Sequence, residues 1–400
     1  MSSEFVSRRC FLASVGAVGG TTLAGCSAVE NSPYSPGEKT NTEWSMPAYD
    51  RGYSGYNPKA AAPREGVTER WSAKVNVPSG RPVVAAGTVF VPTAGRLHAL
   101  DLDSGKKRWH AKSDYSWFNS PVVHDETAYV TYQSVNDKPS MRALDVRDGS
   151  ERWQLSTRGG IKASPTFSYE GRWLFVGDDT GRVYQVDPKN GNVKQTVDVF
   201  GIVNTLAHRR RLLVGTYGGE VYSFLNSGNR LQALWRRKVG GAVKAMITND
   251  PDTIYVATFG GPLYRLSGGA RAGASRWEHE SGSTHLAATN HDVVGTNLAT
   301  MQVVDSETGT EKWTRNDPSG CSPAIAGDTL YVGMRNGVEA YALDGGTNIA
   351  GVRYGFGEKR WSFSTKSVPI EGIAVADGAI FAVTKESEER SSKVYALDPA

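Results

Sequence analysis

One stretch of the sequence decides the fold: Ala99-Leu100-Asp101-Leu102-Asp103-Ser104-Gly105-Lys106-Lys107-Arg108-Trp109. It has the pattern of a strand end, a tight turn built from Asp, Ser and Gly, and a short strand that carries a tryptophan. The same unit returns along the chain, with its aspartate always eight residues before the tryptophan position. The units are Asp101, Gly105 and Trp109; Asp145, Gly149 and Trp153; Asp187, Gly191 and Gln195, where the tryptophan is lost; and Asp305, Gly309 and Trp313.

Each repeat contains short apolar strands joined by Gly and Asp turns. In the first repeat, Pro82–Ala85 and Thr88–Val91 flank Gly87, and Arg96–Leu100 leads into the aspartate turn. Strands of this length and spacing predict four-stranded antiparallel meanders, so we expect an all-β protein. The tryptophan positions lie 36 to 48 residues apart, which is the size of one propeller blade. They are Trp71, Trp109, Trp153, Gln195, Trp235, Trp277, Trp313 and Trp361.

The two ends of the repeat region complement each other. The last repeat, which ends with Leu397-Asp398, has three strands, whereas Val67–Trp71 is a tryptophan strand with no blade before it. We expect the strand that carries Trp71 to complete the last sheet and close an eight-bladed β-propeller over residues 67–400, which leaves no wide exposed sheet edge. We also expect different turns where the aspartate is replaced by Leu225 and Ser267, and an insertion at 345–358.

The N-terminal segment has the pattern of an export signal and an anchor. Arg8 and Arg9 precede a short apolar run that ends in Leu23-Ala24-Gly25-Cys26. Paired arginines before such a run resemble a twin-arginine signal, and the small residues before the cysteine resemble a lipobox, so residues 1–25 are interpreted as a signal peptide and Cys26 as a lipidation site. The composition of residues 26–43 is typical of a flexible tether.

Residues 44–66 differ from the tether in composition. Large aromatic side chains alternate there with Gly and Pro, and a free linker rarely carries so many aromatic residues. We interpret the segment as an ordered, irregular lead-in that packs on the propeller. The repeat region that follows has Cys321 as its one thiol, because the other cysteines are Cys10 and Cys26, so it forms no internal disulfide.

Composition excludes few classes of function. The chain has 45 basic and 41 acidic residues, and a net charge of +4 spread over 400 residues predicts no nucleic-acid surface. The basic runs at 208–211 and 236–238 are interpreted as solvated strand turns, or as contacts to an acidic partner or an anionic membrane.

The Asp-x-x-x-Gly-x-x-x-Trp unit, read around the ring, resembles the PQQ-like β-propeller repeat over residues 67–400. The resemblance implies that the tryptophan packs between blades and that the aspartate–glycine turn positions it. Two branches of the family are relevant: quinoprotein dehydrogenases, which hold PQQ and Ca²⁺ in the funnel, and non-catalytic propellers, among them the lipoprotein subunit of the outer-membrane barrel assembly machinery.

The chemistry of the dehydrogenase branch has little support in the sequence. The chain lacks the adjacent cysteine pair that the branch implies, and no acidic cluster suited to Ca²⁺ lies near an inner strand. His279, His285 and His291 fall on separate strands and turns, which argues against a metal site. We therefore predict no catalytic residue, metal ion or cofactor, with a PQQ- and calcium-dependent dehydrogenase as the alternative.

One set of residues varies while the framework repeats. The start of each innermost strand should border the central funnel, and a varied polar ring on a regular scaffold is where a ligand would be selected. The ring is Arg81, Asn119, Lys162, Asn204, Lys244, His285, Cys321 and Glu371. The sequence thus predicts a monomeric, extracytoplasmic, lipid-anchored propeller that binds an envelope or secreted protein, with an anionic ligand or an acidic peptide conceivable at the ring.

Overall fold

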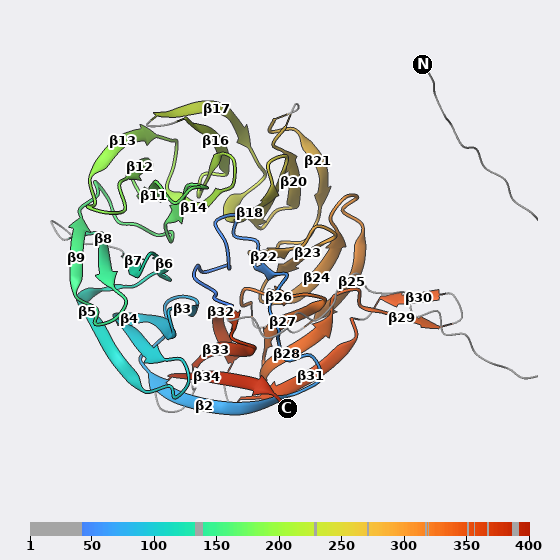
Figure 1. Cartoon of the computed structure of the whole chain (residues 1–400). Helices are drawn as coiled ribbons and strands as arrows, with labels where there is room; N and C mark the ends of the chain where they lie inside the picture. Colours follow the sequence, from blue (N-terminus) through green and yellow to red (C-terminus); the bar gives the residue numbers. More distant parts are fainter. Residues whose placement is uncertain are drawn as a thin grey trace, which may run out of the picture. The chain divides into compact units, whose positions relative to one another are not determined.

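The protein was analysed as a computed structural model that describes residues 42–132, 139–227, 230–269, 272–316, 318, 320–349, 352–355, 357–365, 368–385 and 392–400. Within these ranges the side chains of residues 114–116, 346–349, 352–355, 368–371 and 385 are not described. Within these ranges the chain forms eight small antiparallel sheets in a ring, which is the predicted eight-bladed β-propeller (Figure 1). No helix in the described ranges is long and apolar enough to cross a membrane.

Blades one to four follow one another along the chain. Their strands are β3 (Val83–Ala85), β4 (Thr88–Asp101) and β5 (Lys107–Trp117); β6 (Val122–His124), β7 (Thr127–Thr131), β8 (Met141–Asp145) and β9 (Glu151–Leu155); β10 (Thr166–Phe167), β11 (Leu174–Gly177), β12 (Arg182–Val186) and β13 (Val193–Asp198); and β14 (Val203–His208), β15 (Leu212–Thr216), β16 (Glu220–Ser227) and β17 (Arg230–Lys238).

Blades five to eight complete the ring. Their strands are β18 (Ala242–Asp250), β19 (Thr253–Phe259), β20 (Leu263–Ser267) and β21 (Ser275–His279); β22 (His285–Ala288), β23 (Asp292–Thr296), β24 (Thr300–Asp305) and β25 (Glu311–Asn316); β26 (Ala324–Ala326), β27 (Thr329–Met334), β28 (Gly337–Ala342) and β31 (Lys359–Ser364); and β32 (Val368–Ala376), β33 (Ala379–Lys385), β34 (Ser392–Pro399) and β2 (Val67–Val75).

The ring closes as the sequence predicts. Strand β2 pairs antiparallel with β34, from Val67 opposite Pro399 to Val75 opposite Ser392. The N-terminal strand therefore supplies the outermost strand of the blade that the C-terminal residues build. This closure removes the sheet edge that an open array of blades would expose.

Burial explains why the inner and outer strands differ in sequence. Strand β15, Leu-Leu-Val-Gly-Thr, is buried at every position because both of its faces pack against neighbouring blades. Strand β13, Val-Lys-Gln-Thr-Val-Asp, is the outermost strand of its blade and has no buried residue. Continuous apolar runs therefore mark the inside of the ring, and polar strands mark its rim.

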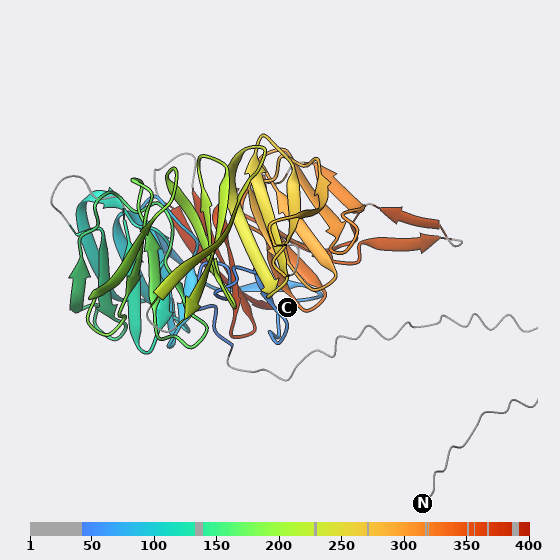
Figure 2. The ribbon, with the colours of Figure 1, turned by 90° about the horizontal axis from the view of Figure 1, so that it is seen from above.

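Three details depart from the regular pattern. In blade one the second and third strands run together as β4, with the turn at Gly95, where φ is +73°. In blade four β16 and β17 continue as one hairpin to Ser227 opposite Arg230, in agreement with the loss of the aspartate at Leu225. In blade seven the insertion forms a separate hairpin of β29 (Gly346–Ile349) and β30 (Val352–Gly355), which projects from the side of the propeller (Figure 2).

The repeated tryptophan and glycine lock neighbouring blades together. The Trp109 indole N–H donates to the Val146 carbonyl in the next blade, at 2.9 Å. A Cβ atom on Gly149, which has φ +74°, would lie 2.6 Å from the Trp109 ring, so only glycine allows this approach. Each glycine turn therefore receives the tryptophan of the preceding blade. The same contact joins Trp71 to Gly105, Trp153 to Gly191, Trp235 to Gly273, Trp277 to Gly309, and Trp313 to Gly345 and Gly357.

The aspartates of this unit hold their own turns. Asp101 accepts hydrogen bonds from Ser104 and pairs with Arg108 at 2.7 Å, and these contacts lower its pKa to about 2. Arg147 and Arg152 hold the pKa of Asp145 well below its usual range. Asp305 accepts hydrogen bonds from Glu307 and Thr308. These hydrogen bonds and ion pairs therefore stabilise the turn that contains each aspartate.

Blade three contacts the next blade without a tryptophan at the repeated position. Gln195 stands at the tryptophan position of blade three, and its side-chain amide donates to the Leu231 carbonyl at 3.3 Å. The Leu231 N–H in turn donates to the Gln195 side-chain oxygen at 2.8 Å. Two hydrogen bonds to the neighbouring blade thus replace the indole contact.

The lead-in crosses one face of the propeller and contacts every blade. Its backbone makes hydrogen bonds of 2.7 to 3.0 Å to seven blades, through Thr42 with Asp377, Trp44 with Val84, Ser45 with Val123, Arg51 with His208, Gly52 with Thr248, Ser54 with Ala288, and Gly55 with Ile325. The remaining blade, blade three, accepts a hydrogen bond from the Arg51 side chain at its Ser168 carbonyl (2.9 Å). A short strand β1 (Tyr56–Asn57) also pairs parallel with β26.

The propeller has two faces that differ in what covers them. The lead-in face is the face covered by residues 42–66, where the first and second strands of each blade are joined. The funnel face is the opposite face, where the first strand of each blade begins. The ordered lead-in includes Thr42 and Glu43, which the sequence assigned to the tether, because Glu43 accepts a hydrogen bond from the Ala86 N–H at 2.8 Å. The signal segment and Cys26 lie outside the described residues.

Candidate functional site

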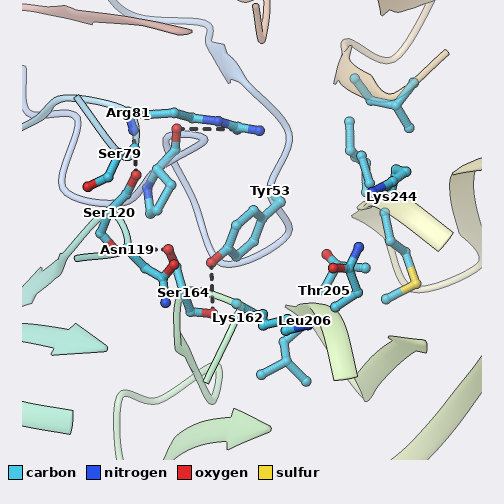
Figure 3. Close-up of a pocket in the computed structure, with 18 residues that line it drawn as sticks. Tyr53, Ser79, Arg81, Asn119, Ser120, Lys162, Ser164, Thr205, Leu206 and Lys244 are labelled. Atoms are coloured by element: carbon cyan, nitrogen blue, oxygen red, sulfur yellow. Dashed lines mark hydrogen bonds between the residues drawn. The ribbon is translucent and has the colours of Figure 1, made fainter. Parts of the chain in front are cut away.

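The centre of the funnel face holds a polar cavity of about 210 Å³. Five of the eight residues predicted to form the funnel ring line it, and they come from five consecutive blades (Figure 3). These residues are Arg81, Asn119, Lys162, Asn204 and Lys244. Three of the five carry a positive charge, and no described lining residue is acidic. The cavity is therefore an electropositive site.

The two asparagines bridge neighbouring blades. The Asn119 amide donates to the Thr131 hydroxyl and to the Ile161 carbonyl, both at 3.0 Å. The Asn204 amide donates to the Val243 carbonyl at 2.7 Å. The side-chain amides of Asn119 and Asn204 thus bond to neighbouring blades, and these bonds hold the wall of the cavity in place.

Two of the three cations, Arg81 and Lys244, are positioned by neighbouring groups. The Arg81 backbone N–H donates to the Ser120 hydroxyl at 2.6 Å, which fixes the chain where it enters blade one. Lys244 lies over two aromatic rings, with its Nζ 4.8 Å from the Tyr217 centroid and 5.6 Å from the Phe259 centroid. Cation–π contacts of this kind orient an ammonium group without neutralising its charge. Lys162 is exposed and has no ion pair within the described ranges.

The pKa of His285 reflects its burial and the positive charges beside the cavity. Burial lowers its pKa to about 3, and the charges of Arg81 and Lys244 lower it further in the same direction. The imidazole is therefore neutral at physiological pH. Its Nδ1 lies 3.1 Å from the Thr284 hydroxyl.

Two further predicted ring members are Cys321 and Glu371. Cys321 is fully buried in the core between blades six and seven, and its sulfur accepts a hydrogen bond from the Gly333 N–H at 3.0 Å. The expectation that Cys321 borders the funnel is therefore wrong, because its side chain points into the blade. Glu371 lies on β32, and its side chain is outside the described residues.

Tyr53 from the lead-in forms the floor of the cavity. Its ring enters from the lead-in face, and its hydroxyl lies 3.4 Å from the Ser164 carbonyl (Figure 3). The same hydroxyl donates to the Pro165 carbonyl at 3.1 Å. Burial raises the pKa of this hydroxyl. Pro47 lines the same floor. The cavity thus opens toward the funnel face and is closed by the lead-in.

An apolar rim lies next to the mouth of the cavity on the funnel face. Phe200, Tyr217 and Phe259 are 69%, 50% and 62% exposed, and Leu298 is 79% exposed. They occupy turns at the same end of the blades as the ring residues, because Phe259 pairs with Ala242 and the Tyr217 N–H donates to the Ile202 carbonyl. Sequence reasoning missed this rim. The rim could have been predicted from the aromatic residue in each of two Thr-aromatic-Gly-Gly turns, at 216–219 and 258–261.

The site was tested against the cofactor of quinoprotein dehydrogenases. Ca²⁺ takes oxygen ligands, mostly carboxylates, and the described lining of the cavity supplies no carboxylate. Among the described residues no group of three His, Cys, Asp or Glu side chains could hold a metal ion. Three positive charges around the cavity also repel a divalent cation. The residues present do not fit a calcium–quinone pair.

Fold and repeat together define the class: an eight-bladed β-propeller built from PQQ-like repeats. A family model described as "Outer membrane protein assembly factor BamB" matches residues 59–201 and 196–367. The chain belongs to this PQQ-like propeller family.

Curated relatives match only part of the chain. The outer membrane protein assembly factor BamB of Nitrosomonas eutropha is 32% identical over 133 residues, which are 32% of this chain and 31% of the relative. The serine/threonine-protein kinase AfsK of Streptomyces griseus is 31% identical over 118 residues, which are 27% of this chain and 14% of the kinase. The chain therefore spans less than a third of the length of either relative in these matches.

Solved structures share the fold. BamB from Moraxella catarrhalis superposes with a TM-score of 0.64 at 16% identity, over 83% of this chain and 98% of that one. Quinohemoprotein alcohol dehydrogenase from Comamonas testosteroni superposes with a TM-score of 0.68 at 13% identity, over 92% and 81%. At these identities the likeness concerns the propeller alone.

Proposed function

We propose that the protein is a lipid-anchored, extracytoplasmic, non-catalytic propeller that binds a protein of the cell envelope through its funnel face. One observation carries the proposal: an electropositive cavity and an exposed aromatic rim lie side by side on the funnel face. Aromatic side chains and arginine are enriched in protein interfaces, and complementary charges direct partners to a site. Kinship with an outer membrane protein assembly factor supports the same role.

The local chemistry defines the segment that would bind. Lys162 and Lys244 favour carboxylates, and Tyr217 and Phe259 offer apolar surface beside them. A partner segment that combines acidic and apolar side chains satisfies both. The blade-locking Asp, Gly and Trp residues take no part, because their contacts stay within the scaffold.

Capture from solubilised envelopes tests the funnel face. The double charge reversal Lys162→Glu and Lys244→Glu should remove the captured partner, because it turns two attractive contacts into repulsive ones. A matched control reverses two exposed lysines far from the funnel, Lys106→Glu and Lys189→Glu. Equal capture by both double variants would contradict the proposal.

Two further experiments test the anchor and the absence of catalysis. Cys26→Ser should release the protein from membranes, because the thiol that receives the lipid is gone. A variant that stays membrane-bound would refute the anchor assignment. Reconstitution with PQQ and Ca²⁺ tests the alternative reading as a dehydrogenase: bound quinone absorbance together with dye-linked oxidation of an alcohol or a sugar would overturn the non-catalytic role.

A further inference from the structure

A groove lies on the outside of the ring where the ring closes, between blade eight and blade one. It measures about 450 Å³, and its walls are β2, which completes blade eight, and the strands β4 and β5 of blade one (Figure 1). Lys74 lies on the β2 side, and Arg96 and Lys107 lie on the side of blade one. No acidic side chain lines the groove among the residues that the structure describes. The groove is therefore electropositive.

The pairing of β4 with β5 places the basic residues of blade one on one face of its sheet. Arg96 lies opposite Lys112, and His98 lies opposite His110. Directly paired residues point to the same face of a sheet, and so do residues two positions apart along a strand. The face that blade one turns toward β2 thus carries Lys112 and His110 in addition to Arg96 and His98, which line the groove.

Two other blades place opposite charges at the position that Arg96 and Lys112 occupy in blade one. This position lies three residues before the residue that faces the repeated tryptophan position. The equivalent pairs are Arg182 with Asp198 in blade three, at 2.7 Å, and Glu220 with Lys238 in blade four, at 3.8 Å. Like charges directly opposite each other destabilise a sheet. Blade one therefore has a repulsive pair where these two blades have an attractive one.

The positive charge of the groove is not neutralised by the described part of the chain. The exposed cations at the groove are Lys74, Arg96, Lys107 and Lys112. None of these four groove cations forms an ion pair within the described ranges. His98 is buried beneath them, with its Nε2 3.0 Å from the Asn76 side-chain oxygen. Burial lowers the pKa of His98 to about 4, and the nearby charges of Arg96 and Lys107 act in the same direction.

The spacing of the groove cations fits an extended polypeptide. Alternate residues of a strand lie about 7 Å apart, and alternate side chains of a bound extended segment have the same spacing. Ala73, Val75 and Leu100 give the groove an apolar surface beside the cations, on which aliphatic groups of such a segment can pack. The described lining has no aromatic side chain, which is the surface that a single-stranded nucleic acid would need for its bases.

We propose that this groove binds an acidic segment of a partner protein in extended conformation, with carboxylates at alternate residues placed on the groove cations. Complementary charges attract such a segment and fix its register. The proposal goes beyond the funnel face, because the groove and the funnel cavity share no lining residue. It also gives a reason for the repulsive pair of Arg96 and Lys112, since binding sites retain arrangements that lower stability.

The test uses the full-length chain and a fluorescent peptide of alternating aspartate and valine, about eight residues long. Binding is followed by fluorescence anisotropy at low ionic strength, where salt screens the charges least. Arg96→Glu and Lys107→Glu should each weaken binding about ten-fold or more, whereas Lys189→Glu, an equal charge change in a turn of blade three, should alter it less than about two-fold. A peptide of the same composition with its aspartates in one block should bind more weakly than the alternating peptide.

The variant Lys112→Glu separates a loss of binding from a loss of folding. It replaces a repulsive cross-strand pair by an attractive one, so the melting temperature should rise by about 1–2 °C. Peptide binding should nevertheless fall about ten-fold, because a groove cation is lost. A protein that is more stable and binds less well has lost a binding group, since partial unfolding would lower both quantities.

The funnel variants distinguish this groove from the funnel cavity. The double variant Lys162→Glu and Lys244→Glu should bind the peptide as the wild type does. If that variant loses the peptide and Arg96→Glu retains it, the acidic segment binds at the funnel and the groove proposal is overturned. It is also overturned if Arg96→Glu and Lys189→Glu bind the peptide equally. Binding of dextran sulfate without binding of the peptide would overturn it as well, because the groove would then select a polysaccharide.

Discussion

The contact between the glycine of one blade and the tryptophan of the preceding blade can be measured by a matched pair of substitutions. Gly149 and Gly260 both have positive φ, at +74° and +70°. A Cβ on Gly149 would lie 2.6 Å from the Trp109 ring, whereas a Cβ on Gly260 would meet no atom within 4 Å. The variants Gly149→Ala and Gly260→Ala therefore share the backbone cost and differ in the steric clash.

The expected magnitudes follow from these two costs. A left-handed backbone costs alanine about 1–2 kcal/mol, and a forced contact in a packed interface costs about 1–3 kcal/mol more. Unfolding entropy of about 2.1 cal/mol/K per residue converts 1 kcal/mol into a shift of about 1.5 °C for a propeller of this length. We expect the melting temperature to fall by about 2 °C for Gly260→Ala and by about 3–7 °C for Gly149→Ala.

Thermal unfolding followed by circular dichroism or calorimetry gives these shifts, and a double variant gives the interaction itself. In a Trp109→Ala background the clash is absent, so Gly149→Ala should cost no more than Gly260→Ala. The reasoning fails if the two glycine variants shift the melting temperature equally in the wild-type background. It also fails if the cost of Gly149→Ala is unchanged when Trp109 is removed.

Three further predictions follow from the structure. Gln195→Ala should lower the free energy of unfolding by about 1–3 kcal/mol, measured by denaturant titration, because it leaves both backbone groups of Leu231 without their partner. Stability should fall as the pH decreases from about 6.5 toward 3, since the unfolded chain protonates His285 there before the folded chain does, and His285→Asn should flatten this slope by up to about 1.4 kcal/mol per pH unit. Tyr53→Phe should destabilise the protein by about 1 kcal/mol through loss of the hydrogen bond to Pro165, and Tyr53→Ala should cost more, because it also removes the floor of the funnel cavity.

The fold was predictable because the same short sequence unit recurs along the chain. A single unit of Asp, Gly and Trp is weak evidence, but copies at a constant spacing leave few architectures, and the unpaired strand with Trp71 leaves one way to close the ring. Even the missing tryptophan at Gln195 did not disturb the count, because the spacing of its neighbours stayed regular. The tryptophan that each glycine contacts was harder to predict, because nothing in the sequence indicates that the turn receives the tryptophan of the preceding blade.

The funnel ring was predictable in part. Alignment of the repeats indicates at which end of a blade a residue lies. For Arg81, Lys162 and Lys244, which line the cavity, this information was enough. It does not find the direction in which the side chain points, because successive residues of a strand face opposite sides. Cys321 stands three residues before β26 and points into the core, so its position along the chain was right and its orientation was not.

The lead-in shows what the repeat pattern could not reveal. Its aromatic residues predicted order, but no periodicity connects Tyr53 with the axis of the ring, and its hydrogen-bond partners are more than a hundred residues away. Its position has a functional consequence. Because Tyr53 lines the cavity from the lead-in face, a partner that uses Lys162 and Lys244 is expected to approach from the funnel face.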